Sequence, residues 1–166
     1  LPEAYTFGLR AVAAENLTLA ADTNYQRWSQ FSRNRLSIDS GPGGATIVTT
    51  IDRDWKDTWH VGGALAYDFG ENHRFAMGIS YDSSPVDDRD RTFDLPFDEI
   101  YKLSFAYAWM GSRQLDFSLG GTLYMIGDAK IDQTSPAVID DRRTRVVGEF
   151  DTNNVLFIGG TVRYQF

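Results

Sequence analysis

The sequence of 166 residues contains no cysteine, which excludes a disulfide framework, a thiolate metal site and a cysteine nucleophile. It has no run of roughly 18 apolar residues, so it offers no transmembrane helix. The net charge is −7 and no long run carries charges of one sign, so the basic footprint of a nucleic-acid-binding protein is missing. Segments with helical periodicity and helix caps are missing too. With 15 glycines and 14% aromatic residues, the composition favours an all-β protein.

What the sequence does contain is strict alternation of apolar and polar residues, the period of a β-strand. The cleanest example has Trp59, Val61, Leu65 and Tyr67 on one face and Thr58, His60 and Asp68 on the other. The pattern predicts seven strands, at about 4–13, 17–28, 55–69, 74–82, 101–109, 115–125 and 156–166.

The apolar faces of these strands indicate contact with lipid. Each is about 9–11 residues long and carries Tyr, Trp or Phe near its ends, as expected of a lipid-facing band between aromatic girdles. A β-sandwich also alternates, but its strands are usually near five or six residues and rarely have aromatic residues at both ends. We therefore predict an antiparallel transmembrane β-barrel.

The lengths of the connections agree with that prediction. Links 14–16, 70–73 and 110–114 are short, whereas links 29–54, 83–98 and 127–154 are long. Outer-membrane barrels have short periplasmic turns and long external loops. Within the first long link, 35–39 and 46–51 are predicted to pair as a hairpin around a glycine-rich tip, extending the second and third strands above the membrane.

An odd number of strands predicts an incomplete barrel. Single-chain bacterial barrels have an even number of strands, and an open sheet edge in lipid costs several kcal/mol for each unpaired backbone group. We therefore expect residues 1–166 to be the C-terminal half of a barrel whose N-terminal plug and first strands are absent. Assembly of several copies into one barrel is the alternative.

Several sequence motifs carry a family resemblance that spans essentially all 166 residues. They are Leu1-Pro2-Glu3, Trp55-Lys56-Asp57-Thr58-Trp59, Tyr81-Asp82-Ser83-Ser84-Pro85-Val86, Leu95-Pro96 and the terminal Tyr164-Gln165-Phe166. Together they resemble the FadL/TodX-like family of outer-membrane fatty-acid transporters. The resemblance implies a monomeric 14-stranded barrel with an N-terminal plug, of which this chain would supply seven strands.

The resemblance also implies a function and a set of partners. Members of the family take up long-chain fatty acids or aromatic hydrocarbons across the bacterial outer membrane, by way of an internal pocket and a lateral gap in the barrel wall. The expected partners are such hydrophobic molecules, outer-membrane lipid and lipopolysaccharide, and the barrel assembly machinery at the C-terminal strand. Neither a cofactor nor a nucleic acid is expected.

A fatty acid needs an apolar groove and a cation for its carboxylate, because an unpaired buried charge is very costly. The strand alternation places a set of basic residues inside the barrel: Arg10, Lys56, His60, Arg74, Lys102 and Arg163. We predict Lys56, His60 and Lys102 as ligand-binding residues, and the family's use of basic pocket residues points first to Lys56. The alternative is that Lys56 pairs with Asp57 or with an acid of a loop. Arg74 and Arg163 are expected to pair with Asp68, Asp116 or the plug.

Other functions fit the sequence less well. A serine hydrolase needs a histidine beside a serine, and neither His60 nor His73 forms such a pair on the lipid-facing side, so we expect no enzyme. The acids between residues 82 and 99 alternate with Arg89 and Arg91, which favours a solvated loop over a metal site. A general porin for small polar solutes and a loop-mediated adhesin or phage receptor remain alternatives. Porins usually line their channels with dense charge, whereas the inner face here is rich in Gly, Ala, Ser and Thr.

Overall fold

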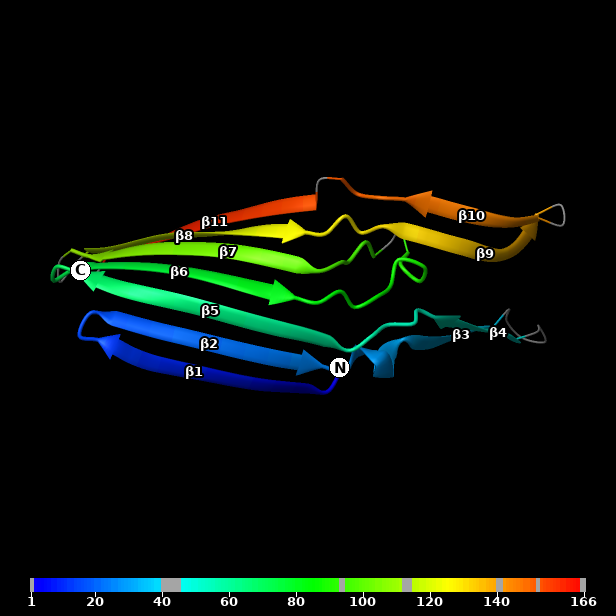
Figure 1. Ribbon diagram of the computed structural model, residues 1–166, viewed down its shortest axis with the longest axis horizontal. Coiled ribbons are helices and arrows are strands. Elements are labelled where there is room, and N and C mark those ends of the chain that lie inside the picture. The colour runs from blue at the N-terminus through cyan, green and yellow to red at the C-terminus, as the bar shows by residue number, and fades with distance from the viewer. Residues whose placement is uncertain are drawn as a thin grey trace.

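The computed structural model describes residues 2–39, 46–92, 95–111, 115–139, 142–151 and 153–164. Its main feature is a seven-stranded sheet in the order β1-β2-β5-β6-β7-β8-β11, with every neighbouring pair antiparallel (Figure 1). The strands are β1 (Ala4–Ala14), β2 (Leu17–Gln26), β5 (Thr58–Phe69), β6 (His73–Asp82), β7 (Ile100–Met110), β8 (Leu115–Ile126) and β11 (Asn153–Tyr164). The predicted antiparallel all-β fold is confirmed.

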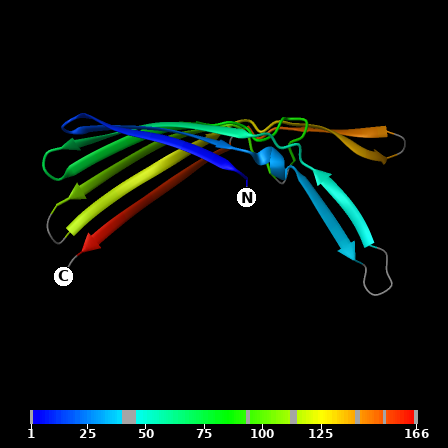
Figure 2. The same cartoon turned by 90° about the horizontal axis from the view of Figure 1, so that it is seen from below.

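Two hairpins extend from one end of this sheet. They pair β3 (Arg33–Asp39) with β4 (Thr46–Asp52), and β9 (Ile131–Ile139) with β10 (Arg142–Gly148). We call this the hairpin end, and the opposite end, with the tight connections, the turn end (Figure 1). At the turn end Gly70 has a φ of 65°, a left-handed conformation that glycine adopts without strain. Figure 2 shows that the sheet is twisted and curved and that the two hairpins diverge.

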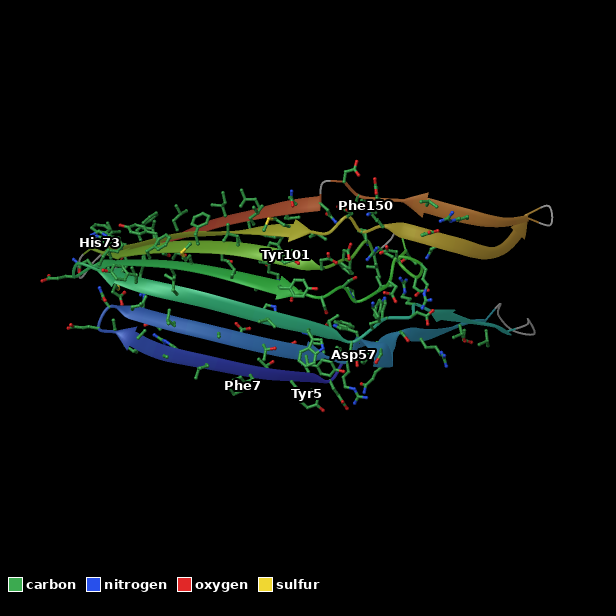
Figure 3. All side chains as sticks on the ribbon, viewed as in Figure 1. Tyr5, Phe7, Asp57, His73, Tyr101 and Phe150 are labelled. Atoms are coloured by element: carbon green, nitrogen blue, oxygen red, sulfur yellow. The ribbon has the colours of Figure 1, made fainter. Side chains whose placement is uncertain are left out.

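The two faces of the sheet differ as the alternation predicts. The face that we call apolar carries large exposed side chains: Tyr5, Phe7, Leu9, Trp59, Val61, Met77, Ile79, Tyr101, Leu103, Phe105, Leu156, Ile158 and Val162. Ile79, near the middle of β6, is 68% exposed. Tyr5 and Phe7 lie along the edge strand β1, and His73 and Tyr101 mark the turn end and the hairpin end (Figure 3). The opposite face, which we call polar, carries the remaining alternate residues.

The sheet does not have the covered core of a β-sandwich. Among the described residues, the fully buried apolar side chains are Val86, Ala129 and Ile131, and all three lie outside the seven long strands. A soluble sheet packs its apolar face against a second layer, whereas here nothing in the described part of the chain covers it. The strands are 10 to 12 residues long, enough to cross a bilayer. No helix in the described ranges is long and apolar enough to span a membrane.

Several predicted boundaries need correction. The second strand ends at Gln26 and is followed by the 3-10 turn η1 (Trp28–Phe31), because that segment bonds to the loops. The third long strand begins at Thr58, not at residue 55, since the Lys56 N–H donates to the Pro85 carbonyl oxygen (2.7 Å) outside any strand ladder.

The hairpins also differ in part from expectation. The predicted pairing of 35–39 with 46–51 is confirmed as β3–β4, but these strands form a separate sheet and do not continue β2 and β5. Its glycine-rich tip lies outside the described residues. The β9–β10 hairpin was not predicted from the alternation. The last strand runs from Asn153 to Tyr164, and the terminal Gln165 and Phe166 are outside the described residues.

Candidate functional site

A pocket of about 310 Å³ opens at the hairpin end, where the polar face of the sheet meets the connecting loops. It is lined by Asn24, Gln26, Trp28, Trp55, Thr58, Trp59, His60, Asp82, Ser83, Pro85, Phe97, Asp98, Ile100, Lys102 and Tyr124. The loops contribute mainly apolar groups together with Asp98, and the strands contribute His60, Asp82 and Lys102. This is the usual composition of a small-molecule site, which is largely apolar with a few convergent polar groups.

The apolar side of the pocket is built from aromatic rings outside the strands. Trp28 of η1 and Trp55 of the following loop meet edge to face, with ring centres 5.7 Å apart. The Trp28 indole N–H donates to the Gln26 side-chain oxygen (2.8 Å), which fixes the ring relative to the end of β2. Phe97 adds a third ring from the link between β6 and β7. Stacked and edge-to-face rings bury much apolar area with little conformational freedom to lose.

The floor of the pocket is a chain of contacts between charged or titratable side chains on neighbouring strands. His60 Nδ1 lies 2.8 Å from Asp82 Oδ1, and His60 Nε2 lies 3.1 Å from Asp22 Oδ2. Lys102 Nζ lies 2.6 Å from Asp82 Oδ2 and 5.4 Å from the centre of the Tyr124 ring. These five residues come from β2, β5, β6, β7 and β8, which are consecutive in the sheet.

Strand register brings these residues together. His60 is directly opposite Asp82, and Lys102 is directly opposite both Ser80 and Tyr124. Because all of them share the polar face, opposite and diagonal neighbours are close enough for charged side chains to meet. The alternation alone predicts the shared face, but the pairing across strands depends on the register.

The roof of the pocket is held by a buried arginine. The Arg91 side chain is 1% exposed, and its guanidinium forms ion pairs with Asp98 (2.9 Å) and Asp88 (2.7 Å). It also donates to the backbone carbonyl oxygens of Phe97 (2.8 Å) and Lys130. The expectation of a simple solvated loop is therefore wrong at Arg91, because this side chain ties the β6–β7 link to the β8–β9 link.

The β8–β9 link packs closely against Asp98. The Ala129 N–H donates to Asp98 Oδ2 (2.9 Å), and the Gly127 N–H donates to the Glu99 carbonyl oxygen (2.9 Å). A Cβ added at Gly127 would lie 2.8 Å from Asp98 Oδ2, so this close approach requires glycine. The hydrogen bond with Asp98, together with burial, raises the pKa of Glu99 above its ordinary value. Asp98 thus fixes both links beside the pocket.

Asp57 fastens the aromatic wall to the sheet. Its carboxylate accepts hydrogen bonds from the Ser29 hydroxyl (2.6 Å), the Ser29 N–H (3.1 Å) and the Tyr25 hydroxyl (2.5 Å). The bond from the Ser29 hydroxyl, and then that from Tyr25, lowers the pKa of Asp57. This contact joins η1 to the segment before β5, so the residues that carry Trp28 and Trp55 are held together.

The predicted ligand-binding residues fall into two places. His60 and Lys102 meet at the floor of the pocket through Asp82. Lys56 lies in the segment before β5 and outside the pocket lining, with its Nζ 2.5 Å from the Asp87 carboxylate. That contact is the loop-acid pairing weighed from the sequence, and it lowers the pKa of Asp87. Ligand binding by these three residues stays a prediction.

The other predicted pairings are confirmed. Arg74 Nε lies 3.2 Å from Asp68, and Arg163 lies 3.6 Å from Asp116. Asp82 belongs to the floor and not to the acidic loop with which the sequence analysis groups it. The alternation of the strand over 74–82 already predicts that Asp82 lies on the polar face with Ser80. That parity was the signal that could have identified it as the central acid of the floor.

Comparison with known proteins identifies the family. The model of the outer membrane protein transport protein family (OMPP1/FadL/TodX) matches residues 1–166. The chain belongs to this family. Its members are transport proteins of the outer membrane of Gram-negative bacteria and are not enzymes, in agreement with the predicted localisation and with the absence of a hydrolase site in the sequence.

More distant relatives agree with this assignment. A long-chain fatty acid transport protein of Escherichia coli O6:H1 is 27% identical over 103 residues, which are 62% of this chain and 22% of that protein. One from Salmonella typhi is 24% identical over 105 residues, covering 63% of this chain and 23% of the relative. The crystal structure of a Pseudomonas aeruginosa FadL homologue superposes with a TM-score of 0.75 at 19% identity. It covers 98% of this chain and 35% of that one, so the family's fold is shown and the chain spans well under half of its relatives' length.

Proposed function

We propose that this chain forms part of a passive outer-membrane transporter for hydrophobic compounds, with long-chain fatty acids as the first candidate ligands. The observation that carries the proposal is the pocket at the hairpin end, which combines three loop aromatic rings with a charged floor. Family membership and the similarity to long-chain fatty acid transport proteins support it.

A ligand would lie with its chain against the rings and its head group toward the floor. Trp28, Trp55 and Phe97 offer apolar contact to the chain, and the head group would lie beside the polar floor that contains His60 and Lys102. Lys56, with a side chain 48% exposed beside Asp87, would act earlier, as a cation at the outer surface. The apolar face of the sheet would meet the lipid and the polar face would line the lumen.

We also propose that further strands close the barrel and that an N-terminal plug fills it. The two outermost strands, β1 and β11, each have one neighbour within the described sheet. In lipid their free edges would leave backbone groups unpaired, at several kcal/mol each. The structural match, which covers 98% of this chain and 35% of the longer homologue, supports a larger barrel; with seven strands from this sheet, we propose 14 in all.

Binding of hexadecanoate to the complete gene product in detergent, measured by calorimetry, tests the proposal. We expect saturable binding, and the Trp28→Ala variant should weaken it about tenfold or more because a buried ring contributes a large apolar area. Trp109→Ala is the matched control, since Trp109 lies at the turn end of β7, outside the pocket lining.

Two results would contradict the proposal. One is the absence of saturable binding by hexadecanoate and by uncharged hydrophobic ligands alike. The other is rapid swelling of liposomes containing the protein in small sugars, which would favour the general porin, since a water-filled channel passes polar solutes.

A further inference from the structure

The cation at the floor of the pocket already has an anionic partner within the protein. Lys102 Nζ lies 2.6 Å from Asp82 Oδ2, and the side chains of both residues are mostly buried, at 23% and 28% exposed. The ammonium group also lies over the Tyr124 ring, 5.4 Å from its centre. Lys102 therefore does not offer an open positive charge to an incoming ligand.

The rest of the pocket does not supply a spare positive charge either. Among the described lining residues, the charged or titratable ones are His60, Asp82, Asp98 and Lys102, with Tyr124 beside them. Asp98 is paired with Arg91 behind the wall. His60 and Lys102 both contact Asp82, so each of these two groups already faces a carboxylate.

Both ring nitrogens of His60 also contact carboxylates of the protein. Its Nδ1 meets Asp82 and its Nε2 meets Asp22, a second carboxylate on the polar face. A ligand carboxylate placed near His60 would thus approach two acids at close range. Like charges at such separations repel, and the repulsion is stronger in a partly buried pocket than in water.

Resting on the proposed function, we propose that Asp82 sets the head-group selectivity of this transporter by acting as an internal counter-ion of Lys102. A ligand carboxylate binds Lys102 only by displacing the Asp82 carboxylate, which then remains partly buried with reduced compensation. This exchange replaces the Asp82–Lys102 ion pair by an ion pair between the ligand and Lys102, so it adds little binding free energy. An uncharged head group, such as an alcohol, leaves the Asp82–Lys102 pair intact. The pocket consequently selects for the apolar chain and holds a charged head group weakly, which favours onward release of the ligand.

Paired affinity measurements on the complete gene product in detergent test this proposal. Dodecanoic acid and dodecan-1-ol have the same chain length, and at about pH 8.5 the free acid is ionised. We expect wild-type protein to bind the acid no more tightly than the alcohol. Asp82→Asn should raise the affinity for the acid about tenfold while leaving that for the alcohol within about twofold, because Lys102 loses its competing partner.

Two further variants locate the effect. Asp68→Asn is the matched control, because it removes a polar-face acid that lies at the turn end, contacts Arg74 and is outside the pocket lining. It should change the ratio of acid to alcohol affinity by less than about threefold. Adding Lys102→Met to Asp82→Asn should abolish the gain in acid affinity and preserve alcohol binding.

The outcomes separate the selectivity proposal from the proposed function. If both ligands bind and Asp82→Asn leaves the affinity ratio unchanged, the role of Asp82 is overturned while the transporter remains supported. If wild-type protein binds neither ligand, the proposed function itself fails. If Asp82→Asn does not fold, the ratio of acid to alcohol affinity in wild-type protein tests the proposal instead. Acid binding more than about tenfold tighter than alcohol binding would contradict a Lys102 that Asp82 already neutralises.

Discussion

Arg91 is a single side chain on which the local order of two loops depends. It lies in the β6–β7 link and reaches the Lys130 carbonyl oxygen, 39 positions further along the chain, while its guanidinium pairs with Asp98 and Asp88. A buried guanidinium is tolerated only when its donors are satisfied, and here ion pairs and carbonyl oxygens satisfy them. The pocket roof owes its shape to this residue.

Arg91→Ala should therefore open both loops without unfolding the sheet. Removal of one partner from a buried ion pair typically costs about 3–5 kcal/mol, so exchange of the Ala129 amide, which donates to Asp98, should accelerate by about two orders of magnitude or more. Hydrogen exchange with mass spectrometry measures this. Arg89→Ala is the control, because the Arg89 side chain is 79% exposed and its removal should leave the exchange unchanged.

The contact between Lys56 and Asp87 should be lost at acidic pH, when the Asp87 carboxylate becomes protonated. The hydrogen bond from Lys56 lowers the pKa of Asp87 below the ordinary value of 3.8, so the folded state favours the ionised carboxylate. Its stabilising contribution is fully present above pH 3.8 and is lost as the pH falls through the lowered pKa. Carbon NMR of the carboxyl group would follow the titration, and Lys56→Met should return it to the ordinary value. A titration of Asp87 at or above 3.8 in unmodified protein would contradict the contact.

At the scale of the element, the two faces of one strand should respond oppositely to the same substitution. Leu103 lies on the apolar face near the middle of β7 and is 44% exposed, while the next residue, Ser104, faces Thr122 on the polar side. In a bilayer, Leu103→Arg should destabilise the folded protein by about 2–4 kcal/mol, the cost of a cation near the membrane centre.

Ser104→Arg serves as the matched control. It removes one hydrogen bond and should cost about 1 kcal/mol. Urea titration of the complete protein folded into phospholipid vesicles would give both values. Equal destabilisation at the two adjacent positions would contradict the assignment of the faces.

The seven long strands could be predicted from the sequence because period-two alternation is a local signal. The same signal failed at Lys56 and at Trp28, where the chain leaves the sheet to bond with loops. The Arg91 contacts cannot be predicted from a local pattern, since they join residues up to 39 positions apart. The β9–β10 hairpin is local, but the residues of β9 do not alternate regularly and its register with β10 shifts between Arg143 and Arg145. Strand alternation placed His60 and Lys102 on one face, but only the register showed that Asp82 lies between them.

At the scale of the whole molecule, the arrangement of burial is the reverse of that in a soluble domain. The long strands leave large apolar side chains exposed on one face, while the fully buried apolar residues that the structure describes lie in the connections at one end. This arrangement is stable only if lipid covers the apolar face. The loops can then fold on their own contacts and hold a pocket above the polar face.

Tryptophan quenching by a brominated long-chain fatty acid tests whether the pocket at the hairpin end binds a fatty acid. In the complete protein in detergent, one variant would retain only Trp28 and Trp55, which line the pocket, and another only Trp109, which lies at the other end of the sheet. We expect saturable quenching of Trp28 and Trp55, reversed by an excess of unbrominated fatty acid, and only weak, non-saturable quenching of Trp109. Equal, non-saturable quenching in both variants would mean that the fatty acid merely dissolves in the detergent around the protein, and would contradict a ligand pocket at the hairpin end.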